Sequence, residues 1–348
     1  MFSLSFWGRN IGIDLGTINL RIYLDKRGII INEPMIAAYN NKTNKVLAFG
    51  VEAKKMLERA PAYITVMKPI QNGVISDFEL TEEIIRHFLK KVSSENSFLG
   101  YRKAVVGVPN SLTEVERKSV EDAVRGAGVF EVYLVDKCLA ASLGARLSIN
   151  EPTANMMVDM GGGATEIAIL SMAGSVITRS LKISGDRLNE DIIRFAREDF
   201  KLAIGELTAE EIKLKIGSAI PISEKLEMYV RGKDLVTGLP KEVLMKDMQV
   251  RSAMSRSLKT IVDSIREVLE AAPPELSGDI LKRGIFISGG TSLLRGISDL
   301  IARELLVQIT MVEDPITCVA RGTGVILENL KKYIPILDNP LKPRDINI

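Results

Sequence analysis

The chain has 348 residues, which is longer than one compact core usually accommodates and indicates at least two domains. Its 46 basic and 44 acidic residues nearly cancel, so the charge balance gives no general attraction to nucleic acid. One histidine and two cysteines exclude a His/Cys metal site and a disulfide framework, and this low cysteine count fits a reducing cytosol.

The N-terminal stretch MFSLSFWGRN is unusually apolar for the leading end of a chain, because it contains Phe2, Leu4, Phe6 and Trp7. Two interpretations stay open: an extension of the first strand, or an anchor at a membrane interface. The stretch lacks the basic start and cleavage site of a signal peptide. No apolar run in the chain reaches the roughly 20 residues that span a bilayer.

Strand-like and helix-like patterns alternate along the chain, which predicts an α/β fold with largely covered sheets. Thr113 and Glu116 form a capping-box pattern at the start of one predicted helix. In the first half we expect strands at 10–16, 19–25, 104–109 and 131–136, and helices at 112–128 and 137–147.

The second half continues the alternation, and a second capping-box pattern at Thr208 and Glu211 predicts a helix over 209–217. Pro273 and Pro274 should end a long helix. We expect a strand at 175–185, a helix from about 188, a two-stranded excursion at 227–245, the long helix at 249–272, a strand, double glycine and helix over 284–305, and a loosely ordered tail at 334–348.

Two segments far apart in the chain share one form. IGIDLGTINLRIYL and MMVDMGGGATEIAIL each read as apolar strand, aspartate, one residue, glycine, short polar turn and apolar strand. The aspartates, Asp14 and Asp159, are too far apart for a solenoid repeat, and their separation suits a duplicated domain.

Such a turn has a defined chemistry. A strand that ends in aspartate and turns through glycine leaves several backbone N–H groups pointing one way, and such nests bind phosphate. Thr17, Asn19 and Thr165 can add side-chain donors. Asp14 and Asp159 can hold a hydrated Mg²⁺ ion, and two such turns facing each other would clamp a triphosphate.

Each turn alone is also compatible with an ordinary hairpin. A third element is Gly289–Gly290, where a strand ends and a helix begins, although a close strand–helix turn explains this pair equally well alone. The P-loop pattern GxxxxGK[ST] is absent. The three glycine-rich strand ends together predict nucleotide binding of another class.

These three motifs resemble the actin/Hsp70/sugar-kinase ATPase superfamily. Further segments are similar to the MreB family of bacterial actin homologues that determine cell shape: INEP, GVISDFE, VGVPNSLTEVER, TGLPKEV, PPELSGDILKRGIF and TSLLRGI. The similarity covers roughly residues 10 to 330. It implies an actin-like ATPase fold, in which two duplicated RNase H-like domains and two smaller inserted subdomains surround an ATP cleft.

The resemblance also implies subdomain boundaries. We expect subdomain IA at 1–33 and 69–148, IB at 34–68, IIA at 149–185 and 254–348, and IIB at 186–253.

Carried over by position, the family's nucleotide-binding residues fall on the two turns, one helix and the last loop. For Glu210 a purely structural explanation also stays open, because the helix macrodipole favours an acid in the first turn of a helix even without a ligand. With the two aspartates, the expected set is Asp14, Gly16, Thr17, Ile18, Asn19, Asp159, Gly161, Gly162, Gly163, Thr165, Glu210, Lys213, Gly289, Gly290, Thr291 and Ser292.

Two positions depart from the family in a way that bears on hydrolysis. The family's water-orienting Glu corresponds to Lys137, and its partner Thr corresponds to Ala164. Loss of a general base lowers a rate by about 10²–10⁴-fold, so the resemblance implies at most a weak ATPase. Asp136 could substitute only across a helical step of about 100°. Lys137 could alternatively pair with the γ-phosphate.

The resemblance further implies ATP or ADP with Mg²⁺ as ligands, and membrane-associated self-assembly, expected as a double filament. Phe98 and Leu99 match a family loop with two adjacent apolar residues, and they favour the membrane interpretation of the N-terminal stretch.

The expected location is cytoplasmic, peripheral at the inner face of the cell membrane. No nucleic acid partner is expected. The departures are typical of one paralogue among several, as in wall-less bacteria such as Spiroplasma, where MreB copies serve helical shape and swimming.

Two alternatives belong to the same superfamily but would not polymerise. An Hsp70-like chaperone ATPase would need a peptide-binding domain after the ATPase domain. A sugar or acetate kinase would need a carboxylate base in a closed substrate pocket.

Overall fold

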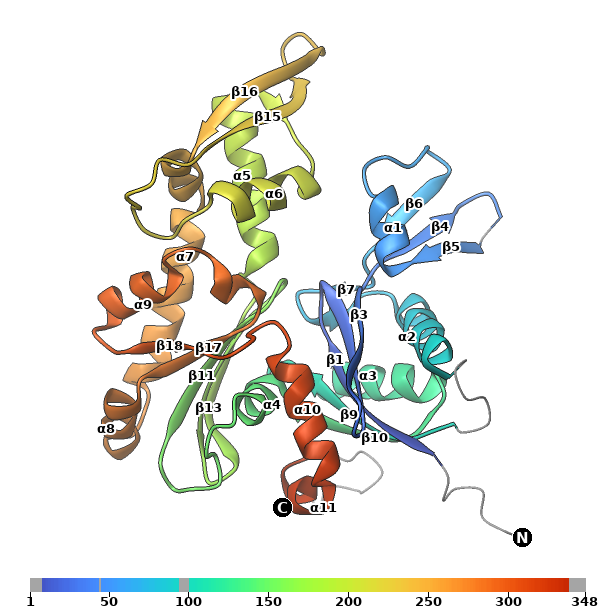
Figure 1. Cartoon of the computed structure of the whole chain (residues 1–348), viewed down its shortest axis with the longest axis vertical. Helices are drawn as coiled ribbons and strands as arrows, with labels where there is room; N and C mark the ends of the chain where they lie inside the picture. Colours follow the sequence, from blue (N-terminus) through green and yellow to red (C-terminus); the bar gives the residue numbers. More distant parts are fainter. Residues whose placement is uncertain (1–7, 44, 94–99, 338–348) are drawn as a thin grey trace. The chain divides into compact units, whose positions relative to one another are not determined.

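The computed structural model describes residues 8–43, 45–93 and 100–337. The chain forms two compact units (Figure 1). Unit 1 comprises the described parts of Met1–Pro152, Leu170–Val176 and Ile316–Ile348. Unit 2 comprises Thr153–Ile169 and Ile177–Pro315. The four subdomain boundaries expected from the sequence are finer than this division and stay a prediction.

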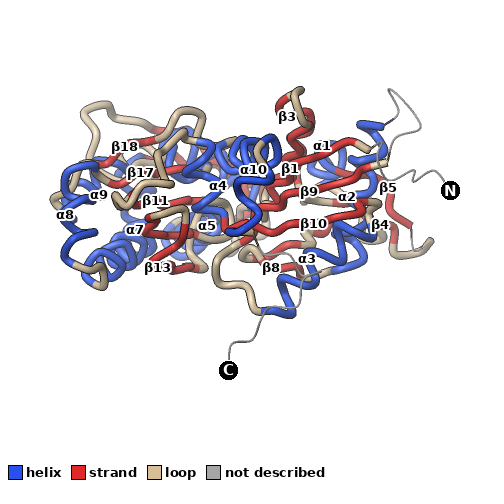
Figure 2. The backbone as a smooth tube through the Cα atoms, turned by 90° about the horizontal axis from the view of Figure 1, so that it is seen from below, coloured by secondary structure: helices blue, strands red, loops and turns tan. Residues whose placement is uncertain are grey.

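Unit 1 is built on a five-stranded sheet with the order β10-β9-β1-β2-β3. β1 pairs antiparallel with β2 and parallel with β9, and β9 pairs parallel with β10; Figure 2 shows β1, β9 and β10 running alongside one another. The strands are β1 (Arg9–Leu15), β2 (Asn19–Leu24), β3 (Gly28–Pro34), β9 (Tyr101–Val108) and β10 (Val129–Asp136). The helices of this part are α2 (Phe78–Ser93), α3 (Glu114–Gly126), α4 (Lys137–Gly144) and α10 (Cys318–Glu328).

A small three-stranded sheet, β5-β4-β6, and short elements complete unit 1. Ile36, Ala38 and Ala53 form its own small core. These elements are β4 (Ala37–Asn40), β5 (Lys45–Phe49), α1 (Gly50–Met56), β6 (Ile64–Met67), β7 (Ile70–Gln71), β8 (Val74–Ile75), α11 (Leu330–Tyr333) and η3 (Ile334–Ile336).

Helix α4 packs closely against α10 (Figure 1). A Cβ atom at Gly144 would lie 2.0 Å from the carbonyl oxygen of Cys318, and one at Gly322 would lie 1.7 Å from that of Ala140. Only glycine permits this approach. The contact fixes the helix that begins with Lys137.

Unit 2 repeats the sheet order of unit 1. Its five-stranded sheet has the order β13-β12-β11-β17-β18, in which β11 pairs parallel with β17 and β17 parallel with β18. Read from the other edge, the sheet of unit 1 is β3-β2-β1-β9-β10, so β11 corresponds to β1 and β17 to β9. The strands are β11 (Asn155–Met160), β12 (Thr165–Ser171), β13 (Gly174–Leu181), β17 (Ile285–Ser288) and β18 (Ile309–Met311). The predicted duplication is therefore confirmed at the level of the sheets.

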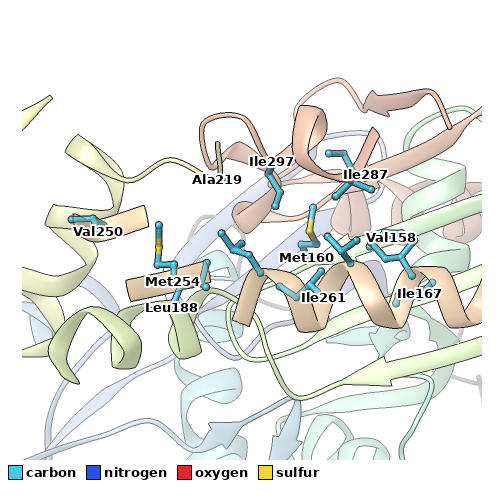
Figure 3. Close-up of a cluster of buried hydrophobic side chains, with 14 of the residues drawn as sticks. Val158, Met160, Ile167, Leu188, Ala219, Val250, Met254, Ile261, Ile287 and Ile297 are labelled. Carbon is cyan, nitrogen blue, oxygen red and sulfur yellow. The ribbon is translucent and has the colours of Figure 1, made fainter. Parts of the chain in front are cut away.

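The remaining elements of unit 2 surround a large apolar cluster. Figure 3 shows part of this cluster, where Val158, Met160 and Ile167 of the central strands lie with Ile261 of the long helix α7. The elements are α5 (Gly185–Asp199), β14 (Leu202–Ala203), α6 (Glu206–Ile216), β15 (Glu227–Asp234), β16 (Pro240–Lys246), α7 (Asp247–Glu270), α8 (Pro274–Arg283), η2 (Gly290–Leu293) and α9 (Ile297–Leu305).

Most predicted elements are confirmed, including the capping box of Thr113 and Glu116. The second capping box is wrong: α6 begins at Glu206 after Gly205, so Thr208 lies inside the first turn and does not cap the helix. The Gly289–Gly290 motif leads into a short 3₁₀ helix, and α9 begins only at Ile297.

Within the described residues, no helix is long and apolar enough to cross a membrane. The six residues predicted to contact the membrane lie outside the described residues: Phe2, Leu4, Phe6, Trp7, Phe98 and Leu99. These positions stay predictions.

Candidate functional site

The first aspartate turn joins β1 to β2. Gly16 closes it by donating its amide hydrogen to the carbonyl oxygen of Asn19 at 3.1 Å. The Thr17 hydroxyl accepts the Gly73 amide at 3.1 Å, and the Asn19 amide nitrogen donates to Asn32 at 2.9 Å. Among residues 8–43, 45–93 and 100–337, no partner is found for the backbone N–H of Thr17 or Ile18. These two amides are donors that an anion could use.

Asp14 lies between two cations. Arg21 donates to Asp14 Oδ2 at 3.0 Å, and the Lys137 ammonium lies 3.4 Å from Oδ1. The Lys137 ammonium also donates to the carbonyl oxygen of Leu15 at 3.2 Å. Only 7% of the Asp14 side chain, 14% of Arg21 and 11% of Lys137 is exposed, so this is a largely buried cluster. The cluster carries one more positive than negative charge.

The second aspartate turn joins β11 to β12 and has the same closure. Gly161 donates its amide hydrogen to the carbonyl oxygen of Ala164 at 3.0 Å. The carbonyl oxygens of Gly161 and Gly162 accept from residues at the start of α5, including Asp186 N at 2.8 Å. For Gly162 and Gly163, no N–H partner is found in the part of the chain that the structure describes. Both turns therefore present amide donors beside an aspartate.

Asp159 has a different neighbourhood from Asp14. The hydroxyl of Ser288 donates to Asp159 Oδ1 at 2.7 Å, and Ser288 is completely buried. The strand register explains the contact, because Asp159 pairs with Ser288 across β11 and β17. In unit 1 the residue that pairs with Asp14 across β1 and β9 is Gly107.

The predicted last loop lies beside the second turn. Thr291 donates its hydroxyl to the carbonyl oxygen of Gly161 at 2.7 Å, and Ser184 donates to the same oxygen at 2.6 Å. A Cβ atom at Gly289 would lie 2.2 Å from the carbonyl oxygen of Met160, so the two loops approach as backbones. Ser292 donates to the Gly289 carbonyl at 2.7 Å.

Two other predicted residues lie on α6. The Lys213 ammonium donates to the carbonyl oxygen of Gly185 at 2.9 Å, which ties α6 to the start of α5 next to Ser184. Glu210 is half-buried on the same helix. The structure thus brings Lys213, the second turn and the last loop together through residues 184 and 185.

One predicted phosphate donor is used otherwise. The hydroxyl of Thr165 is fully buried and donates to the carbonyl oxygen of Ile183 at 2.8 Å. Its proton is therefore directed into the unit, and its contribution is to hold β12 against the segment before α5.

The positions predicted to govern hydrolysis have defined partners. The carbonyl oxygen of Ala164 closes the second turn, and its side chain carries no hydroxyl. Asp136 Oδ1 lies 3.2 Å from Arg117 of α3, in an ion pair that is about one-quarter exposed or less on either side. Lys137 binds Asp14 and the Leu15 carbonyl, a contact within unit 1 that the sequence analysis did not predict.

Three residues near the turns were missed. Arg21 had a detectable signal: it stands directly opposite Asp14 in the β1–β2 hairpin, where opposite charges attract. Ser184 and Ser288 reach their partners only through the tertiary fold, so no local pattern indicates them.

The environment of Asp14 does not suit the predicted Mg²⁺ contact. Both of its oxygens face cations, and a divalent cation needs carboxylate charge that is not already compensated. Asp159 accepts a hydrogen bond from the neutral hydroxyl of Ser288. Within the described residues, no group of three or more His, Cys, Asp or Glu side chains is placed to hold a metal ion.

The sequence matches the MreB/Mbl protein family over residues 8–335. The chain is 41% identical over 326 residues to the cell shape-determining protein Mbl of Bacillus subtilis, covering 94% of this chain and 98% of Mbl. It is 40% identical over 331 residues to the cell shape-determining protein MreB of Escherichia coli K12, covering 94% and 95%.

Solved structures agree with this family. MreB5 of Spiroplasma citri, crystallised with bound ADP, superposes with a TM-score of 0.89 at 32% identity, covering 94% of this chain and 98% of MreB5. MamK, solved as a double helical filament, shares the fold with a TM-score of 0.77 at 22% identity, covering 92% and 98%. The chain therefore belongs to the MreB/Mbl family and has the actin-like ATPase fold.

Proposed function

We propose that this chain binds ADP and ATP through its two aspartate turns and polymerises into membrane-associated filaments, with impaired ATP hydrolysis. The observation that carries nucleotide binding is the matched pair of turns, each closed by the same hydrogen bond, from Gly16 to Asn19 and from Gly161 to Ala164. MreB5 of Spiroplasma citri, a relative at 32% identity, was solved with ADP and with AMPPNP.

The proposed roles follow from the contacts. Thr17, Ile18, Gly162 and Gly163 supply backbone donors to phosphate, Gly161 closes the second turn, and Asn19 adds a side-chain amide. Glu210 and Lys213 flank the base and ribose. The last loop, Gly289–Ser292, is the third contact, in line with its hydrogen bonds to the second turn.

Impaired hydrolysis is supported by three side chains. In-line attack on a γ-phosphate requires a group that orients the water. Lys137 cannot accept a proton from water while it is an ammonium, and Ala164 has no hydroxyl. Asp136 is paired with Arg117 of α3, which argues against its acting as the substitute base.

Phosphate release tests this part of the proposal. We expect the Lys137→Glu/Ala164→Thr double variant to release phosphate from ATP at least about 10²-fold faster than the natural chain, because a general base and its partner are restored. The single Ala164→Thr variant is the matched control and should stay slow. Equal rates for the natural chain and the double variant would refute impaired hydrolysis.

Filament formation is proposed from family membership and from MamK, which was solved as a double helical filament. Membrane association rests on the apolar residues at positions 2, 4, 6, 7, 98 and 99, and many weak anchors on one filament would bind by avidity. The proposed partners are therefore further copies of this chain, the inner face of the cell membrane, and other MreB paralogues.

Sedimentation tests assembly and membrane binding together. We expect the chain to pellet with ATP or AMPPNP, and to carry anionic liposomes with it. A Phe2→Ser/Trp7→Ser variant should pellet without liposomes, since only the anchor is changed. A chain that stays in the supernatant under all nucleotide conditions would contradict filament formation and would favour the Hsp70-like or kinase-like alternatives, which the MreB/Mbl family match disfavours.

A further inference from the structure

We infer that Lys137 is a built-in cation at the first aspartate turn, and that it makes nucleotide binding by this chain nearly independent of Mg²⁺. The inference rests on the proposed nucleotide binding and goes beyond it, because it assigns a role to Lys137 in ligand binding. It is carried by the cluster of Asp14, Arg21 and Lys137.

The lysine is held in place by the fold. It is the first residue of α4, directly after the last residue of β10, and α4 is fixed by its close contact with α10. Its side chain passes beside Gly107 of β9, where a Cβ atom would lie 3.7 Å from Lys137 Cγ and 2.9 Å from Val319 Cγ1. The lysine therefore extends past Gly107 of β9, from the end of β10 to Asp14 on β1.

The carboxylate charge of Asp14 is already compensated within unit 1. Each carboxylate oxygen faces a different cation, Arg21 at Oδ2 and Lys137 at Oδ1. A divalent cation brought to this carboxylate would meet two like charges in a largely buried place, where repulsion is weakly screened. Asp14 is therefore a poor ligand for Mg²⁺ or for its water shell.

The cluster suits an anion instead. It has a net positive charge and lies next to the backbone N–H groups of Thr17 and Ile18, to which no partner is assigned in the described parts of the chain. Phosphate prefers such a combination of amide donors and a lysine. Lys137 therefore provides at this turn the positive charge that a metal ion would otherwise bring.

Calorimetric titration of the full chain with ADP tests the inference, because binding is read without any turnover. Titrations are run at one ionic strength, with MgCl₂ or with EDTA. We expect the two dissociation constants of the natural chain to agree within about 3-fold, since the fixed ammonium needs no metal. In Lys137→Glu, a second carboxylate beside Asp14 should make binding at least about 30-fold tighter with Mg²⁺ than with EDTA.

Matched variants separate charge from structure. Lys137→Arg keeps the charge and should remain within about 3-fold, whereas the neutral Lys137→Gln should lose at least about 10-fold in EDTA. Lys103→Gln removes another lysine ion pair of unit 1, with Glu131 at 3.3 Å, and should behave like the natural chain. Circular dichroism verifies folding; if Lys137→Glu does not fold, Lys137→Gln and Lys137→Arg decide.

The outcomes are distinct. Natural chain that binds ADP tightly with Mg²⁺ but at least about 30-fold more weakly in EDTA would overturn the inference and leave nucleotide binding intact. Lys137→Gln that binds like the natural chain in EDTA would also overturn it. Absence of ADP binding under both conditions would refute the proposed function itself.

Discussion

The two aspartate turns share one closing backbone hydrogen bond, but different side chains contact their aspartates. Each follows the central strand of its sheet, and each is closed by an amide-to-carbonyl hydrogen bond at the same spacing. Arg21 follows Asp14 along the chain at the same spacing at which Glu166 follows Asp159. Glu166 accepts a hydrogen bond from Ser180. Duplication has kept the strand and turn geometry, while the neighbours of the aspartate have diverged.

The divergence extends to the adjacent parallel strand. Asp159 is held by the hydroxyl of Ser288, whereas Asp14 stands opposite Gly107 and is held by charges from β2 and α4. Asp159 thus accepts from a neutral donor, whereas both oxygens of Asp14 face cations. A buried carboxylate between two cations should be far more sensitive to neutralisation.

Neutralising each aspartate should have the largest effect and should separate the two turns most clearly. Asp14→Asn leaves Arg21 and Lys137 as uncompensated, largely buried cations, and should lower the free energy of unfolding by about 3–5 kcal/mol. Asp159→Asn removes one charged hydrogen bond and should cost about 1–2 kcal/mol. Urea denaturation followed by circular dichroism measures both. The Asp14→Asn/Lys137→Met double variant should recover part of the loss; equal costs for the two single variants would contradict the distinction.

The next largest effect on stability should come from giving the first turn the serine that the second turn has. Gly107→Ser places a side chain where Ser288 lies in unit 2, but its Cβ would come within 2.9 Å of Val319 Cγ1. Overpacking of this kind should destabilise the protein by about 1–3 kcal/mol in urea denaturation. Adding Val319→Ala should relieve the overlap, so the double variant should be more stable than Gly107→Ser alone. A Gly107→Ser variant as stable as the natural chain would mean that Val319 gives way without loss of packing.

Removing the neutral partner of Asp159 should have a smaller effect. Ser288→Ala deletes a buried hydroxyl that donates at 2.7 Å, and should cost about 1–2 kcal/mol in the same measurement. Ser292→Ala is the control for loss of a hydroxyl at the same end of the sheet, because the Ser292 hydroxyl donates at 2.7 Å to the Gly289 carbonyl instead of to Asp159. If Ser288→Ala cost as much as Asp14→Asn, the two aspartates would be equally dependent on their partners.

Sequence patterns were sufficient for the features that depend on local spacing. The strand–aspartate–glycine form predicted both turns, and the capping box predicted the start of α3, because neighbouring residues make these contacts. The Arg21–Asp14 ion pair could also have been predicted, because the hairpin register places the two residues opposite each other.

Contacts between distant segments could not be predicted in this way. The ion pair of Lys137 with Asp14 requires β10 to lie two strands from β1, with Gly107 between them. Ser288 reaches Asp159 only because β17 pairs with β11. The failed capping box at Thr208 has a local cause: α6 gains two residues before it, starting after Gly205, and local propensity did not define that boundary.

The smallest expected effect concerns the second strand of each turn. β2 alternates between buried and half-buried residues. The ring of its Tyr23 lies against Gly324 of α10, and the Tyr23 hydroxyl donates to Glu328 at 2.8 Å. Tyr23 follows Asp14 at the same sequence spacing at which Ala168, which is fully buried, follows Asp159. Burial first, and then the hydrogen bond to Glu328, raise the pKa of Tyr23 from 10.0 to about 12.

This shift gives unit 1 an alkaline response that β12 lacks. Because the folded state holds the phenol proton more tightly than the unfolded state, the stabilisation is complete below pH 10 and is lost as the pH rises through about 12. Tyr23→Phe should therefore lessen the decline of the urea midpoint between pH 10 and pH 12, to which Tyr133 of β10 also contributes because its pKa is likewise raised to about 12. At pH 7 the substitution should cost only about 0.5–1 kcal/mol. Tyr39→Phe, on the small sheet of the same unit, is the tyrosine control. A decline that persists unchanged in Tyr23→Phe would show that the hydroxyl contact with α10 does not distinguish β2 from β12.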